Sequence, residues 1–325
     1  MERPGDYSYP QAMNVHASTH GSHSLLVLHD PETGARVSAY PDRGATIHQI
    51  ELPGKEGDVR GVLYPMRTDV EVSRQRWAKG AHLAPWPNRI QDAVYTFEGK
   101  EYHPFKSFRS QGGHAMHGTV MHEPFAQDRR AAREGVLALE LVSKGWQGYP
   151  WPLRTRVELR LEAGAFRMDV EIENRGKTNA PAGHGWHPYF TLGRDVRECL
   201  LTLPKGQRLG MTSRAVPDGT RSRWKRFAKP EIVGPDFLND CIEVQAGEGR
   251  VATRLQDPAT GEGIEVWQEA GAGRYAYVQV FTHPRRHCLA IEPMTCAGNA
   301  FQNGMGLVVL APGEVLKTSC GVRRI

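Results

Sequence analysis

The amino-acid sequence predicts an all-β protein, built as one large antiparallel β-sandwich with long functional loops. Three observations carry this prediction. One stretch alternates apolar and charged residues with strict period two over two consecutive strands. Other short apolar runs lie between Gly, Asp and Pro residues, and the 35 Gly and 22 Pro suit many tight turns. No segment has the apolar periodicity of an amphipathic helix of three turns or more.

The clearest element is a β-hairpin in the middle of the chain. In residues 153–161 the odd positions are apolar or Thr and the even positions are charged. After a turn at 162–165, apolar residues alternate with charged ones in the same way as far as Ile172. Each strand therefore has one face for the core and one for water. Arg side chains on one strand opposite acids on the other favour cross-strand pairing.

The other predicted strands are short. We expect them at 24–29, 35–40, 94–97, 101–103, 136–142, 263–268, 275–281 and 307–310. No linker or internal repeat interrupts the series. The sequence therefore predicts a single domain over residues 23–325, preceded by a polar N-terminal arm over residues 1–22.

Composition and charge exclude several classes of function. The net charge is only +5, and no stripe of Lys and Arg resembles a nucleic-acid footprint. The apolar stretches are too short to span a bilayer, and the N-terminus lacks the apolar core of a signal peptide. Five cysteines without a CxxC pair suggest reduced, buried thiols. We therefore expect a cytoplasmic protein with neither a nucleic acid nor a membrane as partner.

One basic cluster leaves two interpretations open. It consists of Arg221, Arg223, Lys225 and Arg226, with Trp224 among them. A solvated loop is the more usual explanation of such a cluster, and an anion or phosphate site is the alternative.

Glu292 is the first candidate for chemistry. It ends a short apolar run, and Pro293 is expected to stop the strand because proline has no backbone N–H. Burial at the end of a strand would raise the carboxyl pKa toward the range of a base that works at neutral pH. An ion pair at the rim with Arg285 or Arg286 would explain the same residue equally well.

Two loops contain the histidines of interest. Residues 112–118 hold His114 and His117 among glycines, and residues 183–190 hold His184 and His187 beside three aromatic residues. Sugar sites combine aromatic faces with a few fixed polar groups, so this composition suits a carbohydrate. Both loops have an H-x-x-H spacing. They lack a neighbouring Cys or an H-E-x-x-H helix, and we expect no metal.

Three further residues have weaker signals. Asn88 and Arg89 follow the loop 84–87, and the planar guanidinium of Arg89 suits recognition of hydroxyl or carboxylate groups. Asp240 lies between apolar residues and could accept hydrogen bonds from sugar hydroxyls. A structural ion pair or a turn cap would explain each of them as well.

These motifs, in this order, resemble the aldose 1-epimerase (galactose mutarotase) family from about Ser24 to the C-terminus. The His-Pro-Tyr-Phe and Glu-Pro runs are the most specific. The residues that carry the resemblance are Pro87-Asn88-Arg89-Ile90, His117-Gly118, Gly148-Tyr149-Pro150-Trp151-Pro152, Gly185-Trp186-His187-Pro188-Tyr189-Phe190, Asp240, Ile291-Glu292-Pro293-Met294-Thr295, Asn299-Ala300-Phe301, Gly306-Leu307 and Ala311-Pro312-Gly313-Glu314.

The resemblance implies a β-supersandwich that opens and recloses a sugar ring without metal or organic cofactor. Glu292 would be the general base for the anomeric hydroxyl, and His187 the general acid for the ring oxygen. Arg89, His117 and Asp240 would hold the sugar, with Asn88 beside them. The additional histidines His114 and His184 would either read a substituent on the sugar or pack. We expect a small-molecule sugar as partner, and a monomer or weak dimer.

Three functions are compared. The first is 1-epimerisation of a free hexose such as glucose or galactose. The second is the same reaction on a hexose 6-phosphate, suggested by the basic cluster at 221–226. The third is a non-catalytic sugar-binding module on the same fold, against which Glu292 and His187 both argue. A glycosidase is disfavoured because that chemistry normally needs two facing carboxylates.

Overall fold

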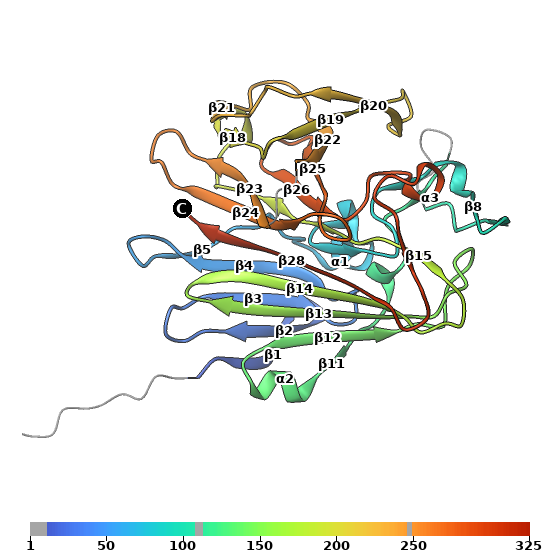
Figure 1. The fold of residues 1–325 in the computed structure, drawn as a ribbon. Helices are drawn as coiled ribbons and strands as arrows, with labels where there is room; N and C mark the ends of the chain where they lie inside the picture. Colours follow the sequence, from blue (N-terminus) through green and yellow to red (C-terminus); the bar gives the residue numbers. More distant parts are fainter. Residues whose placement is uncertain (1–11, 108–112, 246–248) are drawn as a thin grey trace, which may run out of the picture.

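The computed structural model describes residues 12–107, 113–245 and 249–325, and these residues fold almost entirely into antiparallel strands (Figure 1). Residues 1–11 of the predicted arm and Gly112 of the first histidine loop lie outside the described residues. The predicted all-β fold with short strands is confirmed. In the described ranges no helix exceeds five residues, and no helix is long and apolar enough to cross a bilayer.

The largest sheet has nine strands and contains the predicted hairpin. Its strands, in spatial order, are β11 (Ala126–Gln127), β12 (Leu137–Val142), β13 (Leu153–Glu162), β14 (Ala165–Asn174), β28 (Val315–Arg324), β24 (Gly263–Ala270), β23 (Gly249–Gln256), β18 (Leu200–Thr202) and β21 (Glu231–Ile232).

A second sheet of eight strands carries the site described below. Its order is β20 (Pro217–Arg223), β19 (Gly206–Met211), β22 (Asn239–Val244), β25 (Tyr277–Thr282), β26 (Leu289–Met294), β16 (Gly185–His187) and β6 (Ala81–Leu83), and β17 (Tyr189–Phe190) also pairs with β26. A third sheet contains β1 (Asn14–His20), β2 (His23–His29), β3 (Arg36–Tyr40), β4 (Thr46–Pro53) and β5 (Val59–Gly61).

Short ladders and helices complete the chain. The ladders pair β7 (Arg89–Ile90) with β10 (Ala115–Met116), β8 (Tyr95–Phe97) with β9 (Lys100–Tyr102), and β15 (Ala180–Ala182) with β27 (Val308–Leu310). The helices are α1 (Asp69–Ser73), α2 (Arg129–Arg133) and α3 (Ala300–Asn303), with 3₁₀ turns η1 (Arg76–Ala78), η2 (Gln91–Ala93), η4 (Val120–His122) and η5 (Val196–Glu198).

The N-terminal boundary expected at residue 22 is wrong. Residues Asn14–His20 form β1, which pairs residue by residue with β2 from Asn14 opposite His29 to His20 opposite His23. The polar composition of β1 suggested an arm. It instead reflects an edge strand with only one neighbour, whose side chains remain largely in water.

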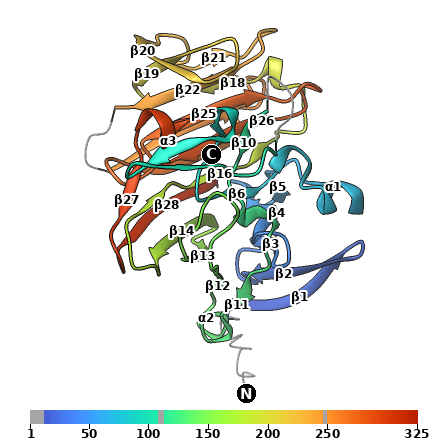
Figure 2. The same ribbon diagram turned by 90° about the vertical axis from the view of Figure 1, so that its right-hand side faces the viewer.

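The sheets form two layers around one core. The five- and eight-stranded sheets abut where Leu63 bridges Phe190 and where Tyr64 N–H donates to Tyr189 O at 2.7 Å. Strands β12, β13 and β14 lie over β2, β3 and β4 (Figures 1 and 2). One apolar cluster takes side chains from all three sheets, including Ile50, Phe166 and Ile291. The predicted β-sandwich is therefore confirmed.

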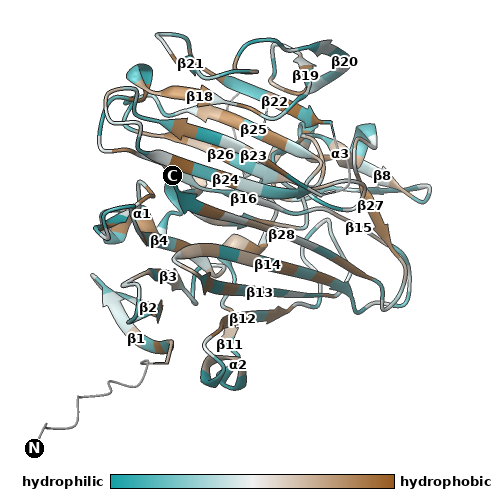
Figure 3. Cartoon of the chain, turned by 60° about the vertical axis from the view of Figure 1, so that its left-hand side comes forward, coloured by the Kyte–Doolittle hydropathy of each residue, from teal (hydrophilic) through white to brown (hydrophobic). Residues whose placement is uncertain are grey.

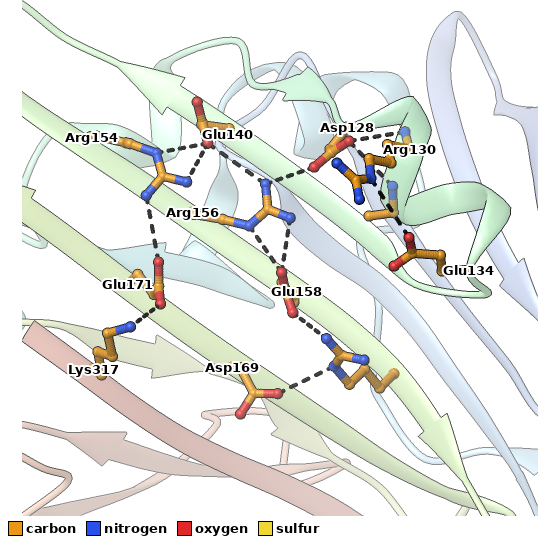
Figure 4. A network of polar contacts seen from close by, with 12 residues as sticks. Asp128, Arg130, Glu134, Glu140, Arg154, Arg156, Glu158, Asp169, Glu171 and Lys317 are labelled. Atoms are coloured by element: carbon orange, nitrogen blue, oxygen red, sulfur yellow. Dashed lines mark hydrogen bonds and ion pairs between the residues drawn. The ribbon is translucent and has the colours of Figure 1, made fainter. Parts of the chain in front are cut away.

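The hairpin β13–β14 has the predicted two faces. Its apolar positions are buried, and apolar and polar segments alternate along both strands in Figure 3. The other face carries a connected ionic network (Figure 4) in which Arg156 bonds Asp128 at 3.0 Å and Glu158 at 2.9 Å. Arg154 joins Glu140 at 2.7 Å in the same network. The five cysteines are free and buried, as predicted.

Candidate active site

A cavity of about 490 Å³ opens on one face of the eight-stranded sheet, and several of its polar lining groups come from adjacent strands. Gly185 pairs with Met294 and Tyr189 pairs with Ala290, so the same register sets His187 of β16 directly opposite Glu292 of β26. On the other side, Gln279 of β25 pairs with Glu292. Directly opposite residues point to the same face of a sheet. His187, Glu292 and Gln279 therefore form one row across the cavity floor.

The histidine and the glutamate of this row are in contact. His187 Nε2 lies 3.5 Å from Glu292 Oε1, and the side chains are only 8% and 3% exposed. Burial raises the pKa of Glu292 to about 8, although the charge of Arg89 acts in the opposite direction. Burial lowers the pKa of His187 to about 4. Between these two values the pair holds a single proton, which either group can carry.

Glu292 is not a rim residue, and Pro293 does not end its strand. Strand β26 continues to Met294, with Pro293 opposite Val278. Ile291 and Thr295 donate toward β17 and β16, to Pro188 O and His184 O. By the same register Pro293 lies opposite Trp186 of β16, so its missing N–H removes one ladder bond on that side. The bonds of Ile291 and Thr295 and the pairing with β25 continue on either side of it, and the expected strand end is wrong.

The alternative of a rim ion pair is also wrong for Arg286. Its guanidinium donates to the backbone carbonyls of Pro235 and Asp236, at 3.1 and 2.7 Å. Within the described ranges, no ion pair joins Glu292 to Arg285 or Arg286. The cation whose charge acts on Glu292 is Arg89.

Asn88, Arg89 and His117 form one wall of the cavity, as a locked unit. His117 N–H donates to Asn88 O at 2.8 Å, and Asn88 N–H donates to His117 Nδ1 at 3.3 Å. Arg89 Nη1 donates to Asn88 Oδ1 at 3.0 Å. Burial lowers the pKa of His117 well below its ordinary value, so its ring is neutral. Because Nδ1 accepts a bond, the ring hydrogen lies on Nε2 and is available to a ligand.

The loop that holds His117 requires glycine after it. Gly118 has φ +69°, and a Cβ there would lie 1.9 Å from Ala84 O. Asn88 and His117 themselves have φ near +60°, a conformation that costs about 1 kcal/mol or more and is concentrated at functional sites. The imidazole of His117 packs edge-on against that of His187, with ring centroids 5.2 Å apart.

Asp240 does not line the cavity. Its pair partner in β25 is Val280, a core residue on the face opposite Glu292, and its carboxylate accepts from Arg208 Nε at 2.6 Å. The neighbouring residue Asn239 lines the cavity instead. Gln279 Nε2 donates to Asn239 Oδ1 at 3.0 Å, so two amides stand where an acid was expected.

The additional histidines are packed away from the cavity. His184 Nδ1 lies 2.9 Å from the Tyr275 hydroxyl, and its Nε2 lies 3.3 Å from His82 Nδ1. His114 Nδ1 accepts from Asp92 N–H at 3.2 Å. The two histidines of each H-x-x-H spacing thus have different surroundings. Among the described residues, no group of three or more His, Cys, Asp or Glu side chains could hold a metal ion.

Sequence reasoning missed several cavity residues. Gln279 is a polar residue in the apolar strand 277–281 and could have been noticed, since such an exception within a buried strand needs a partner. Arg74, Arg76 and Trp77 line the outer part of the cavity and come from a segment without a recognisable pattern.

The sequence model of aldose 1-epimerases matches residues 25–323. The chain belongs to the aldose 1-epimerase family. The uncharacterised protein YihR of Escherichia coli K12 is 28% identical over 250 residues, which cover 72% of this chain and 75% of YihR. An aldose 1-epimerase of the same organism is 27% identical over 213 residues, or 61% of this chain and 59% of that enzyme.

A solved structure shares the fold of this aldose 1-epimerase family member. The galactose mutarotase-like protein of Clostridium acetobutylicum superimposes with a TM-score of 0.81 at 14% identity, over 97% of this chain and 99% of that chain. The predicted family and fold are therefore confirmed, and the protein is an enzyme of the isomerase class. The roles of individual site residues stay predictions.

Proposed function

We propose that the protein interconverts the α and β anomers of an aldohexose, with Glu292 and His187 as its proton-transfer pair. The contact between a buried carboxyl and a buried imidazole on the floor of a sugar-sized cavity is the observation that carries this proposal. The pKa of Glu292 is raised and that of His187 is lowered, so the two values lie on either side of neutral pH.

The reaction uses the one proton that the pair holds. The proton first passes from Glu292 to His187 across their contact. Glu292, then a carboxylate, takes the proton from the anomeric hydroxyl, while His187, then an imidazolium, gives its proton to the ring oxygen. The bond between C1 and the ring oxygen breaks and leaves an open-chain aldehyde. After rotation about the C1–C2 bond, the ring oxygen attacks the other face of the carbonyl. The two residues then exchange roles, which returns the pair to its starting state.

The cavity walls suit a polyhydroxylated ring. His117 Nε2–H, the guanidinium of Arg89 and the amides of Gln279 and Asn239 supply donors and acceptors at fixed positions. Gln279 Oε1 and Glu292 Oε2 are buried without a partner among the described residues. Buried polar atoms of this kind are normally satisfied, so a ligand with hydroxyl groups would complete them.

The basic cluster at 221–226 does not support a phosphorylated substrate. It lies on and after β20, at the far edge of the sheet, four strands from β26. At about 4.8 Å per strand, this separation is about 19 Å. Arg221 is engaged by Glu243, and Arg226 by Asp236 at 2.8 Å. A purely binding role is disfavoured by the His187–Glu292 contact.

Polarimetry of freshly dissolved α-glucose and α-galactose tests the proposal. Glu292→Gln and His187→Asn should each lower the catalysed rate of mutarotation by about 10²–10⁴-fold, because each removes a proton-transfer partner. Glu56→Gln and His103→Asn change the same residue types at exposed positions and should keep the wild-type rate. Near-normal catalysis by folded Glu292→Gln would refute the assignment of this residue.

A further inference from the structure

The charge of the cavity lining is unbalanced. Its outer part contains Arg74 and Arg76, and its inner part contains Arg89. Glu292 is its single acid among the described residues, and burial favours the protonated form of that acid. The carboxylate of Asp240 could have balanced this positive charge, but it faces away from the cavity and forms an ion pair with Arg208. A neutral sugar would leave this excess of positive charge without a counter-charge.

The two outer arginines are held on the cavity wall by the segment that follows α1. Gln75 is buried and donates to Arg43 O, Thr46 Oγ1 and Met121 O at 3.1, 3.3 and 2.9 Å. Lys79 is also buried and lies 3.6 Å from Glu71. Since these residues anchor the inner side of the segment, its other side chains are directed outward.

The backbone of the same segment is strained. Gln75, Trp77 and Ala78 all have positive φ, at 47°, 64° and 49°. A non-glycine residue in this region costs about 1–3 kcal/mol, so the surrounding structure must stabilise its conformation. The buried hydrogen bonds of Gln75 provide this stabilisation here. The strained turn exposes the arginines on either side of Gln75, together with the indole of Trp77, at the mouth of the cavity.

The guanidinium groups of Arg74 and Arg76 form no ion pair or hydrogen bond with the described residues. The acid of the same segment, Glu71, feels the charge of Arg76, but its carboxylate is engaged by Arg67 N–H at 2.8 Å and by Lys79. Most other arginines of the protein lie in ion pairs, such as Arg197 with Asp195 at 2.6 Å. Two unengaged guanidiniums in one substrate cavity therefore need a different explanation from surface charge.

We propose that the sugar carries an oxyanion substituent away from C1, and that Arg74 and Arg76 bind it. The inference rests on the proposed reaction and deepens it, because it names the class of substrate: an anionic aldohexose. Carboxylate, phosphate and sulfonate groups share the required chemistry, since the planar fork of arginine donates two parallel bonds to any of them. Trp77, packed against His283 at 5.2 Å between ring centroids, adds an aromatic face beside these arginines.

Exchange NMR at anomeric equilibrium tests the inference with four sugars: glucose, glucuronate, glucose 6-phosphate and a 6-sulfonated glucose. Wild type should convert at least one anionic sugar with kcat/KM about tenfold or more above that for glucose, as expected for one charge-assisted contact. Arg74→Gln and Arg76→Gln should each remove about tenfold of that preference through KM and leave glucose within about twofold. Added salt should weaken the anionic reaction alone.

Arg133→Gln is the matched control, because it removes the same charge from an exposed helix outside the cavity, and it should change nothing. Equal wild-type rates on all four sugars would overturn the inference and leave the proposed reaction intact. The same holds if the two cavity variants lower the glucose and anion rates equally. Absence of turnover with every sugar would overturn the proposed reaction, and this inference with it. The anionic sugar with the highest kcat/KM identifies which oxyanion the site binds.

Discussion

Replacing Glu292 by Gln should stabilise the protein at neutral pH while it abolishes catalysis. Burial raises the pKa of Glu292 from 4.5 to about 8. The folded protein therefore binds this proton more tightly than the unfolded chain does. By linkage, the titration of Glu292 does not lower the free energy of unfolding of the wild type below about pH 4.5. That free energy falls as the pH rises from about 4.5 to about 8. Glutamine has nearly the same shape and carries no titrating proton, so it escapes this loss.

The size of the effect follows from the two pKa values. One pKa unit corresponds to about 1.4 kcal/mol. At pH 7, about 2.5 units above the unfolded value, the buried acid lowers the free energy of unfolding by about 3 kcal/mol. Above pH 8 the loss reaches about 5 kcal/mol. The pKa of about 8 already includes the favourable interaction of the carboxylate with Arg89. For a chain of 325 residues, about 3 kcal/mol corresponds to a rise of roughly 4 °C in Tm.

Thermal unfolding of both proteins at pH 4.5, 7 and 8 measures the effect. The difference in Tm between Glu292→Gln and wild type should be near zero at pH 4.5 and grow with pH. Glu56→Gln removes an acid from the exposed turn between β4 and β5 and should show no such trend. A lower Tm for the variant at pH 7, or a difference independent of pH, would refute the reasoning that burial controls the pKa of Glu292.

Two further predictions concern the same cavity. The kcat/KM of wild type should form a bell with limbs near pH 4 and pH 8, since the pair must hold one proton, and a profile flat across this range would contradict the shared proton. Asn239→Ala should raise KM by about fivefold to tenfold, which corresponds to the loss of one hydrogen bond of about 1–1.4 kcal/mol. Asp240→Asn should leave KM unchanged and destabilise folding by less than about 1 kcal/mol, because its partner Arg208 is half exposed. A larger KM effect at Asp240 than at Asn239 would reverse the assignment of these neighbours.

The sequence predicted best where a simple period governs the structure. The hairpin appears at Leu153–Glu162 and Ala165–Asn174, within three residues of the predicted ends, because one buried face enforces alternation. The placement of Asn239 on the cavity lining and of Asp240 away from it has the same origin. Neighbours in a strand face opposite sides, and the sequence 237–242 does not reveal which side holds the cavity. Pairing with β25 decides it.

Other features depend on contacts that no local pattern encodes. Pro293 was expected to end its strand, and it does not, because β25 pairs with β26 on one side and β16 and β17 pair with it on the other. The pairing with β16 and β17 joins segments about a hundred residues apart. Arg74 and Arg76 escaped notice for a similar reason: they are directed to the cavity by the burial of Gln75, whose partners lie on distant loops.

The residues proposed for proton transfer, His187 and Glu292, lie on paired strands, and those proposed to bind the substituent lie on a turn. Strand β26, which carries Glu292, pairs with β16 and β17 on one side and with β25 on the other, so a hydrogen-bonded ladder fixes the separation of the two side chains. Proton transfer needs this precision, because it fails when heavy atoms move beyond hydrogen-bond reach. The groups proposed to read the substituent lie instead on the turn after α1. A charge contact tolerates small displacements better than a proton transfer does, since Coulomb energy falls slowly with distance. Changes in that turn should therefore alter which sugar is accepted while the ring-opening chemistry on the strands continues.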